Sequence, residues 1–483
     1  MRDGRRMLLL SMLLLLACAT NPVTGKREFM LVSESQEISM GREADPQIVA
    51  TYGLYDDPEL AAYVDEVGQK LAAVSHRADL QYTFRVLDSP VLNAFALPGG
   101  YIYVTRGILA HMNNEAELAM VLGHEIGHVT ARHSAEQYSR ATLAGLGLGI
   151  GSLVVPEVAQ YGHLAQTALG LLFLKYGRDD EHESDELGVQ YSVAAGYDPE
   201  RGATFFEVLD RQQQESGQAL PGWLSTHPAP ADRVARTRAR AAEVKGQGVY
   251  RVGEATHKEQ IDGTVFGEDP RQGFMDGDTF KHPDQEFQLE FPAGWRVVNA
   301  TTAVVATEAK DQAQLQLTLE RSEGASPRAF VLRLAEAAQA QIVESGVETI
   351  HGYDAYIALL QVTRNGQTGL IQVGAIQREK GGLIYQFLGR AASRFRSWQP
   401  LLLQSVRSFA PLQDRAALRI EPNRLAVVTL ARPQTLAQAA AGYADAPVAA
   451  EKLALLNNLQ VDTPLDVGFR LKIVRGTYHG GRK

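Results

Sequence analysis

The stretch VLGHEIGHVTARH at residues 121–133 places three of the chain's 12 histidines close together in an apolar segment. On an α-helix, residues four apart lie about 40° from each other, so His124 and His128 project from one face, one turn apart. A buried imidazole needs a partner for its ring nitrogen, because burial of an unsatisfied polar group is costly. Two neutral imidazoles at this spacing can reach a single Zn²⁺ ion, so the stretch predicts a metal site.

Glu125, beside the first of these histidines, lies about 100° further around the helix. There it can contact a metal-bound water without ligating the metal, which suits a general base. The arrangement is the HExxH pattern of zinc metallopeptidases. His133 follows His128 by five residues, about 140° around the helix, and is therefore expected to point away from the ion.

A catalytic zinc site needs a third protein ligand and one position left open for water. The downstream segment GRDDEHESDELG, residues 177–188, offers several candidates. Glu181 and Asp185 are four residues apart and share a helix face, so Glu181 can ligate the ion while Asp185 holds the free ring nitrogen of a liganding histidine. Periodicity alone does not exclude His182 or Glu183 as the third ligand.

Strands are predicted before the histidine helix, where LNAFALPGGYIYVTRGIL alternates apolar with polar or aromatic residues around a Pro-Gly-Gly turn. An exposed strand edge formed by Asn93, Ala94, Phe95 and Ala96 would bind an extended peptide through main-chain hydrogen bonds. Such an edge favours unfolded segments over folded ones. The alternative is that these four residues form an ordinary core strand.

The remaining chain divides by composition and periodicity, and 483 residues suffice for about three domains. We expect an α+β protein, with a signal peptide over residues 1–17 and a mainly helical metallopeptidase domain with a small β-sheet over 18–245. A linker over 246–279 leads to an α+β module of unknown role over 280–410. A strand, helix, helix, strand module is expected over 411–483.

This last module resembles a degenerate LysM module, a type that binds peptidoglycan or chitin-like glycans. RPQTL stands where such modules usually open with Gly-Asp-Thr-Leu. An unrelated cap domain is the alternative.

The first 20 residues, MRDGRRMLLLSMLLLLACAT, predict export. Basic residues precede an apolar run that suits a secretory signal and is too short to span a bilayer. Cys18, the only cysteine, follows LLA and resembles the lipidated residue of a bacterial lipobox. Ala19 after it, rather than Asp, implies transfer to the outer membrane. The protein is therefore expected on the periplasmic side of the envelope, anchored by lipid on Cys18.

Residues 141–175 are unusually apolar, and Pro156, Glu157 and His163 divide them into two pieces. Each piece is shorter than the roughly 20 residues that a membrane span requires. The segment predicts a helical hairpin that is buried or contacts the membrane surface, and it is a candidate lid over the site.

Four segments together resemble the zinc metalloendopeptidase family that includes HtpX, the CAAX prenyl proteases and the periplasmic protease BepA: HEIGHVTARH, EHESDELG, NAFALPGGYIYVTRGIL and STHPAPADRVAR. The resemblance covers about residues 25–245. It implies a gluzincin-type fold with one Zn²⁺ per chain. The family's third ligand is the Glu of an ExxxD pattern, which here falls on Glu181 with Asp185.

The resemblance also implies a resting state. In BepA-like relatives a His-Pro loop lies over the site, and its histidine can occupy the open zinc position. Carried over, His227 would be a fourth ligand that holds the enzyme latent. Arg233 would support the oxyanion or the loop.

These features favour a zinc metalloendopeptidase that hydrolyses unfolded or misfolded cell-envelope proteins. One alternative is a chaperone or assembly factor with latent protease activity, and another is a peptidoglycan hydrolase recruited by the C-terminal module. The net charge of −9 and the pI near 5.8 argue against nucleic acid as a partner, because nucleic-acid surfaces need concentrated Lys and Arg.

Overall fold

The computed structural model describes the chain except for residues 1–17, 149–175, 217–226, 228–231, 365–366, 380–381, 443–447 and 479–483. The predicted signal peptide and most of the predicted hairpin therefore lie outside the described residues. Among the described helices, none combines the length and apolar character that crossing a membrane requires.

The described chain forms two compact units. Unit 1 comprises residues 1–267 and 423–476, and unit 2 comprises residues 268–422 and 477–483. Helices and strands are mixed in both, as the expected α+β class requires.

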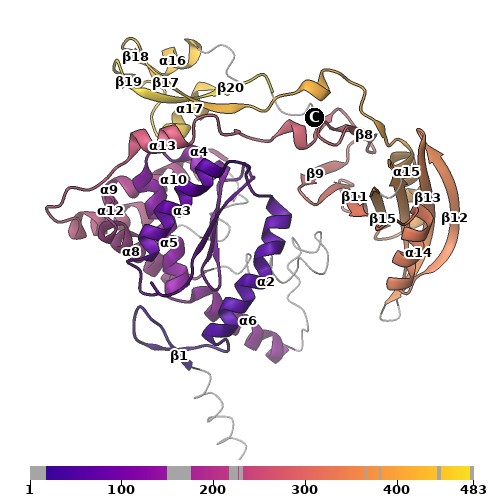
Figure 1. Cartoon of the computed structure of the whole chain (residues 1–483), viewed down its shortest axis with the longest axis horizontal. Coiled ribbons are helices and arrows are strands. Elements are labelled where there is room, and N and C mark those ends of the chain that lie inside the picture. Colours follow the sequence, from indigo (N-terminus) through magenta and orange to yellow (C-terminus); the bar gives the residue numbers. More distant parts are fainter. Residues whose placement is uncertain are drawn as a thin grey trace, which may run out of the picture. The chain divides into compact units, whose positions relative to one another are not determined.

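Helix α5 (Glu115–Thr130) is the central helix of unit 1, and every one of its residues is buried. Asn114 caps its start by accepting a hydrogen bond from the Glu117 backbone N–H at 3.0 Å. Around α5 lie α3 (Pro58–Ala72) and α8 (Arg178–Ala194), as Figure 1 shows. The histidine helix is thus held inside the core.

A small sheet covers another side of α5, in the strand order β3 (Thr83–Leu87), β5 (Tyr101–Thr105), β4 (Ala94–Leu97). β5 pairs parallel with β3 and antiparallel with β4. Gly99 and Gly100 make the tight β4–β5 turn with φ of 79° and 91°, values that glycine adopts without strain. The predicted Pro-Gly-Gly turn is confirmed.

Glycines allow α5 and α8 to approach closely. A Cβ added at Gly123 would lie 3.1 Å from the Gly188 Cα, and one added at Gly127 would lie 3.1 Å from the Ser184 Cα. In the other direction, a Cβ at Gly188 would lie 3.1 Å from the backbone nitrogen of His124. Larger residues at these positions would force the two helices apart.

The other elements of unit 1 surround this centre: β1 (Cys18–Thr20), β2 (Arg27–Phe29), α2 (Glu34–Tyr52), α4 (Arg106–His111), α6 (His133–Leu148), α9 (Pro199–Gly202), α10 (Phe205–Ser216), α12 (Arg233–Val244) and α13 (Glu254–Gln260). Helix α13 lies in the segment expected to be a linker, and its His257 and Lys258 are buried. Two turns of helix are too short to show a clear apolar period, which is why the sequence did not reveal it.

The C-terminal segment has the expected order of strands and helices: β17 (Arg424–Thr429), β18 (Gln434–Thr435), α16 (Leu436–Gly442), α17 (Ala450–Leu456), β19 (Pro464–Leu465) and β20 (Arg470–Arg475). β17 and β20 pair antiparallel. This order is compatible with a LysM-like module, and the resemblance stays a prediction.

This C-terminal segment belongs to unit 1 and is not a separate body (Figure 1). Leu471 and Ile473 share a hydrophobic core with the residues of α5. Lys472 is fully buried, and its Nζ donates to the carbonyl oxygens of Ala110 and Met112 at 2.8 and 2.7 Å. It thereby satisfies carbonyls that the end of helix α4 leaves without helical partners. Periodicity shows that a strand has a buried face but not which surface covers it.

Unit 2 contains a seven-stranded antiparallel sheet in the order β12-β13-β14-β15-β11-β10-β9. Helix α14 (Pro327–Ala337) packs on one face and α15 (Phe395–Arg407) on the other. The strands are β9 (Arg296–Ala300), β10 (Ala303–Thr307), β11 (Ala313–Arg321), β12 (Gln341–Ile350), β13 (Tyr353–Arg364), β14 (Gln367–Gln377) and β15 (Leu383–Ala391).

A second sheet of unit 2 joins β16 (Ala410–Pro411), β8 (Phe287–Glu290), β7 (Thr279–His282) and β6 (Phe274–Asp276). Helices and strands thus share this part of the chain, as the predicted α+β module requires.

The α5–α8 packing makes a direct prediction. Gly188→Val should lower the melting temperature and the zinc content together, because overpacking of this kind typically costs about 1–3 kcal/mol and moves α8 away from the histidines. Gly442→Val is the matched control, since a Cβ there meets no atom of the described residues within 4 Å. Circular dichroism melting and metal analysis check both variants. Unchanged zinc content in Gly188→Val would show that the close approach does not matter for the site.

Candidate active site

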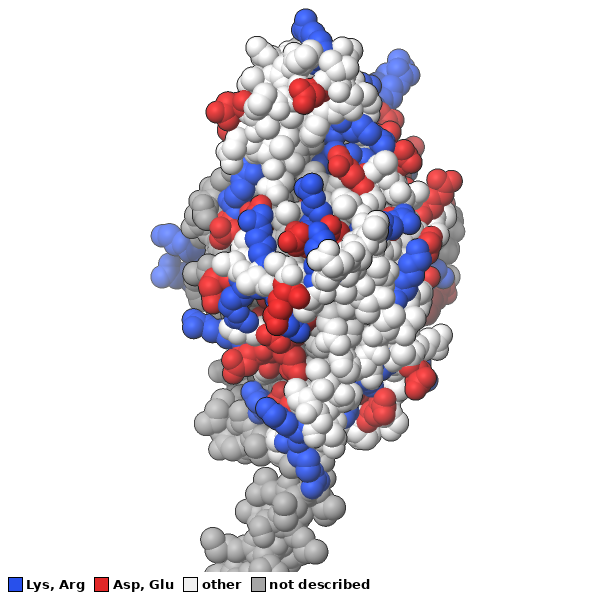
Figure 2. Space-filling model, turned by 90° about the vertical axis from the view of Figure 1, so that its left-hand side faces the viewer, with Lys and Arg blue, Asp and Glu red and all other residues white. Residues whose placement is uncertain are grey.

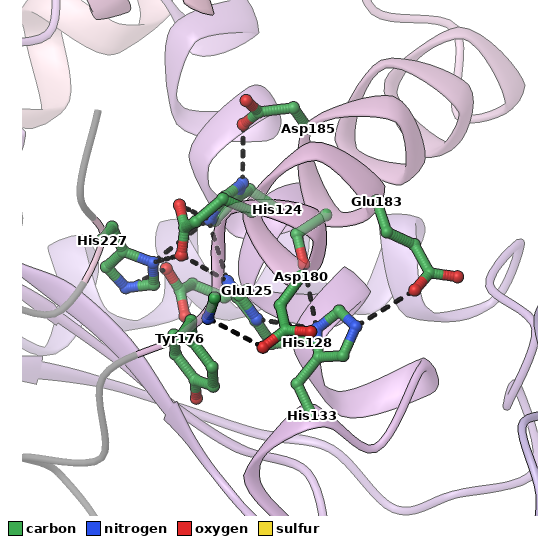
Figure 3. Close-up of polar contacts among 12 residues, drawn as sticks. His124, Glu125, His128, His133, Tyr176, Asp180, Glu183, Asp185 and His227 are labelled. Atoms are coloured by element: carbon green, nitrogen blue, oxygen red, sulfur yellow. Dashed lines mark hydrogen bonds and ion pairs between the residues drawn. The ribbon is translucent and has the colours of Figure 1, made fainter. Parts of the chain in front are cut away.

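Helices α5 and α8 bring the predicted ligands together (Figure 3). The Nε2 atoms of His124 and His128 lie 3.1 Å apart. Glu181 Oε2 is 3.6 Å from the first of these nitrogens, and Glu181 Oε1 is 3.5 Å from the second. His227 Nδ1 completes the group, at 3.3 Å from His124 Nε2 and 2.8 Å from Glu181 Oε1. One ligand atom from each of the four residues lies within 4.8 Å of the others.

This geometry fits a bound cation. Ligand atoms held tetrahedrally at about 2.0–2.1 Å from Zn²⁺ are about 3.3 Å apart, close to the separations of 2.8 to 3.6 Å found here. Glu181 Oε2 is buried and makes no hydrogen bond within the described part of the chain, and Arg233 Nη1, 3.4 Å away, belongs to a guanidinium that also pairs with Asp185. One guanidinium shared by two buried carboxylates leaves negative charge that a bound cation would compensate. Three imidazoles and one carboxylate are also the donor types that zinc prefers.

The protonation states suit metal binding, because ligating imidazoles must be neutral. Burial lowers the pKa of His124 to about 4 and holds the pKa of His128 well below its usual value. Burial raises the pKa of Glu181, but His227 and His128 outweigh it, so that the pKa lies well below its usual value. The site therefore presents two neutral imidazoles and an ionised carboxylate.

Asp185 takes the place predicted for it. Its Oδ1 lies 2.9 Å from His124 Nδ1, so the carboxylate accepts the ring proton and fixes the tautomer that leaves Nε2 able to bind a metal. Arg233 holds Asp185 in turn, with Nη2 and Nε at 2.6 and 3.1 Å from the same oxygen. The guanidinium also lies 4.3 Å from the centre of the Phe206 ring. Arg233 thus supports the ligand shell from behind.

Glu125 is fully buried beside the ligands. Burial raises its pKa to about 7, and the neighbouring Glu181 adds to the rise, while His227 and the backbone of Ala96 lower it. Its Oε1 lies 3.6 Å from His227 Nε2. Burial lowers the pKa of His227, but Glu181 and Glu125 outweigh burial and raise it. In the absence of an ion, protonated His227 can pair with both carboxylates.

The strand expected to bind substrate is an edge strand, since β4 pairs only with β5 in the described chain. It lies against α5, and Asn93, Ala94, Phe95 and Ala96 are all buried. The side chains are thus buried as in a core strand, while the main-chain edge of β4 that faces away from β5 has no strand partner in the described chain.

His133 differs from its expected orientation. Helix α5 ends at Thr130, and Arg132 adopts a left-handed conformation with φ of 64°, so the chain turns before His133. The ring then lies back against the site, with Nδ1 2.9 Å from His128 Nδ1. The expectation assumed that the helix continued. His133 nevertheless lies outside the group of potential ligands among the described residues.

The two alternative ligands lie elsewhere. Glu183 Oε2 is 3.1 Å from His133 Nε2, and His182 contacts Arg236. The sequence gave no sign of Tyr176, whose ring stacks on His128 at 3.9 Å between centroids. Its hydroxyl lies 2.8 Å from Ser134 Oγ. Ser134 reaches that position because the chain turns after Thr130. The pattern of apolar residues does not reveal this turn.

Known proteins match this part of the chain. Residues 58–241 match the model described as peptidase family M48. The mitochondrial metalloendopeptidase OMA1 of Schizosaccharomyces pombe is 34% identical over 219 residues, which are 44% of this chain and 63% of that protein. The beta-barrel assembly-enhancing protease of Escherichia coli K12 is 32% identical over 237 residues, which are 47% of this chain and 48% of that protein.

A third relative is the mitochondrial metalloendopeptidase OMA1 of Arabidopsis thaliana, 37% identical over 165 residues, 34% of this chain and 32% of that protein. The chain thus spans less than two thirds of the length of each of these relatives. The segment matched by the family model contains His124, His128, Glu181 and His227, the four residues that converge in the structure. Residues 58–241 are therefore similar to peptidase family M48 over the segment that holds the four converging residues.

Proposed function

We propose that this protein is a zinc-dependent metalloendopeptidase that hydrolyses unfolded or misfolded proteins of the cell envelope. The observation that carries the proposal is the convergence of His124, His128 and Glu181, with Glu125 buried beside them. Two imidazoles and a carboxylate are a zinc-ligand set of hydrolytic enzymes. One metal ion per chain is expected.

Each side chain then has a role in peptide hydrolysis. Zinc bound there supplies Lewis acidity, which activates water and stabilises negative charge on oxygen. Glu125 takes the proton of the attacking water and passes it to the leaving amine. Asp185 keeps His124 in its binding tautomer, and Arg233 neutralises the charge of Asp185.

Substrate would bind along β4, whose free edge can add an extended peptide strand next to Glu125. Main-chain pairing selects for unfolded segments, because a folded protein has already paired its backbone. His227 lies on the ligand group, so a substrate carbonyl reaches that position only after His227 leaves. This contact supports a latent resting state.

The cellular setting is inferred from the sequence and the relatives. The lipobox-like Cys18 supports a lipid anchor on the periplasmic face of the outer membrane. One relative is named beta-barrel assembly-enhancing protease, and we infer for this chain a role in quality control of cell-envelope proteins. A LysM-like C-terminal segment would add contact with peptidoglycan.

The surface charge agrees with protein clients. On the face drawn in Figure 2, Lys and Arg are interspersed with Asp and Glu among the described residues, next to wide areas of uncharged residues. Nucleic-acid binding relies on basic side chains gathered on one face.

A second candidate function is that of a chaperone or assembly factor whose proteolysis is suppressed. The position of His227 within the ligand group favours it. It predicts a metal-loaded protein that binds unfolded clients and cleaves them slowly.

Glu125→Gln should abolish cleavage of an unfolded protein such as reduced casein, while about one zinc per chain remains bound. Loss of a general base typically reduces the rate about 10²- to 10⁴-fold, and glutamine keeps the size of the side chain. Fluorescent casein hydrolysis and metal analysis check this. Glu186→Gln, an exposed carboxylate on α8, is the control. Full activity in Glu125→Gln would contradict the assigned base, and release of soluble fragments from purified peptidoglycan instead of casein would favour the cell-wall hydrolase.

His227→Ala should raise casein hydrolysis several-fold and leave the zinc content unchanged, because three protein ligands remain after the fourth is removed. The same assay, with His76→Ala as the control, measures the change. His76 contacts Tyr191 and lies outside the ligand group. A fall in both activity and zinc content would show that His227 is a required ligand and does not merely block the open position.

A further inference from the structure

The outer nitrogen of His128 has an unusual partner for a metal ligand. His128 Nδ1 lies 2.9 Å from the Nδ1 of a second imidazole, His133. His133 Nε2 in turn lies 3.1 Å from Glu183 Oε2. Figure 3 shows the two contacts in line, running from His128 through His133 to Glu183 on α8. The proposed function gives His133 and Glu183 no part.

One assignment of protons satisfies this whole chain of contacts. If His128 binds a metal through Nε2, that nitrogen uses its lone pair and the proton of the neutral ring sits on Nδ1. His128 Nδ1–H then donates to His133 Nδ1, which must be an acceptor. The proton of neutral His133 therefore sits on Nε2 and is donated to the Glu183 carboxylate.

The other histidine ligand, His124, also ends on a carboxylate, but without an intervening residue. His124 Nδ1 donates directly to Asp185 at 2.9 Å. Helix α8 thus supplies a terminal carboxylate to both histidine ligands, to His124 directly and to His128 through one intervening imidazole. Such partners orient the ligand ring and raise its basicity.

The position of His133 is built into the fold. The side chain is 2% exposed, whereas Glu183 is 25% exposed. The left-handed Arg132 turns the chain so that His133 faces α8, and the Arg132 side chain is itself fixed by Glu37 at 2.7 Å. Ser184 Oγ lies 3.4 Å from His133 Nδ1 and limits rotation of the ring.

We propose that His133 and Glu183 are positioning residues of the metal centre, forming a relay that holds His128 in the Nδ1–H tautomer and in the orientation needed for Nε2 to bind the ion. This inference rests on the proposed zinc-dependent function. Neither residue touches the substrate. The relay acts on metal affinity first and on activity only through bound metal.

Zinc affinity of the full chain, measured by competition with a chromophoric chelator, is the first test. His133→Phe removes the acceptor and keeps a buried ring, and it should weaken zinc binding about 10- to 100-fold. His133→Asn should restore most of the affinity, because its amide oxygen can accept from His128 Nδ1. The melting temperature of the metal-free protein should stay close to that of wild type in both variants, which separates positioning from folding.

The part played by Glu183 is tested by a double-mutant cycle. Glu183→Ala should weaken zinc binding in the wild-type background and have no further effect when His133 is already Phe. Glu186→Ala is the matched control, an exposed carboxylate one turn along the same helix whose removal should change nothing. Should His133→Phe fail to fold, Glu183→Ala at its partly exposed position still tests the relay against this control.

Nitrogen-15 NMR of histidine in the zinc-loaded protein gives a readout that a purely structural role would not produce. The His128 Nδ1–H resonance should show scalar coupling to His133 Nδ1 across the hydrogen bond, and the coupling should vanish in His133→Asn.

Three outcomes overturn the relay. If wild type binds one zinc but His133→Phe and Glu183→Ala bind it equally well, the relay is wrong and the proposed function stands. If wild type binds no zinc, both are wrong. Additive losses in the double mutant would also contradict a relay that runs through His133 to Glu183.

Discussion

The close packing of α5 against α8 is the constraint on which the rest of the site depends. Two ligands come from one helix and one from the other, so the distance between the helix axes sets the distance between Glu181 and the imidazoles. Gly123, Gly127 and Gly188 permit that distance because a Cβ at each would lie about 3.1 Å from the opposite helix. The glycines are thus part of the metal site although none of them carries a ligand.

Charge balance among buried groups is a second constraint on the site. Glu125, Glu181 and Asp185 are all buried, and such a group of carboxylates is stable only with compensating positive charge. Arg233 supplies one charge and pairs with Asp185 and Glu181. Protonated His227 can supply another when no ion is present, since both carboxylates beside it raise its pKa. A bound divalent cation, or protonated His227 when no ion is present, therefore satisfies the same electrostatic need.

The arrangement of the residues at the centre of the site follows from local sequence patterns. The spacing of His124, Glu125 and His128 depends only on helix geometry, and the structure places them as expected. Glu181 and Asp185 share a helix face, but family resemblance was needed to choose Glu181 over its neighbours. The orientation of His133 was missed because it depends on one left-handed residue, Arg132, and nothing in the apolar pattern marks the end of α5.

Long-range packing was harder to predict from the sequence than the local geometry of the site. The order of strands and helices in the C-terminal segment was predicted, yet its association with the peptidase core was not, because a buried Lys472 reads in sequence as an exposed strand residue. That association depends on which surface meets a given element, and periodicity contains no information on that.

Lys472 also has a consequence for how the protein matures. It bonds to Met112, 360 residues earlier in the chain, at the end of the helix that precedes the HExxH helix. A nascent chain that emerges from its N-terminus carries the complete zinc motif long before the strand that closes the same core has been synthesised. The core around the HExxH helix is therefore complete only after residue 472 has been synthesised.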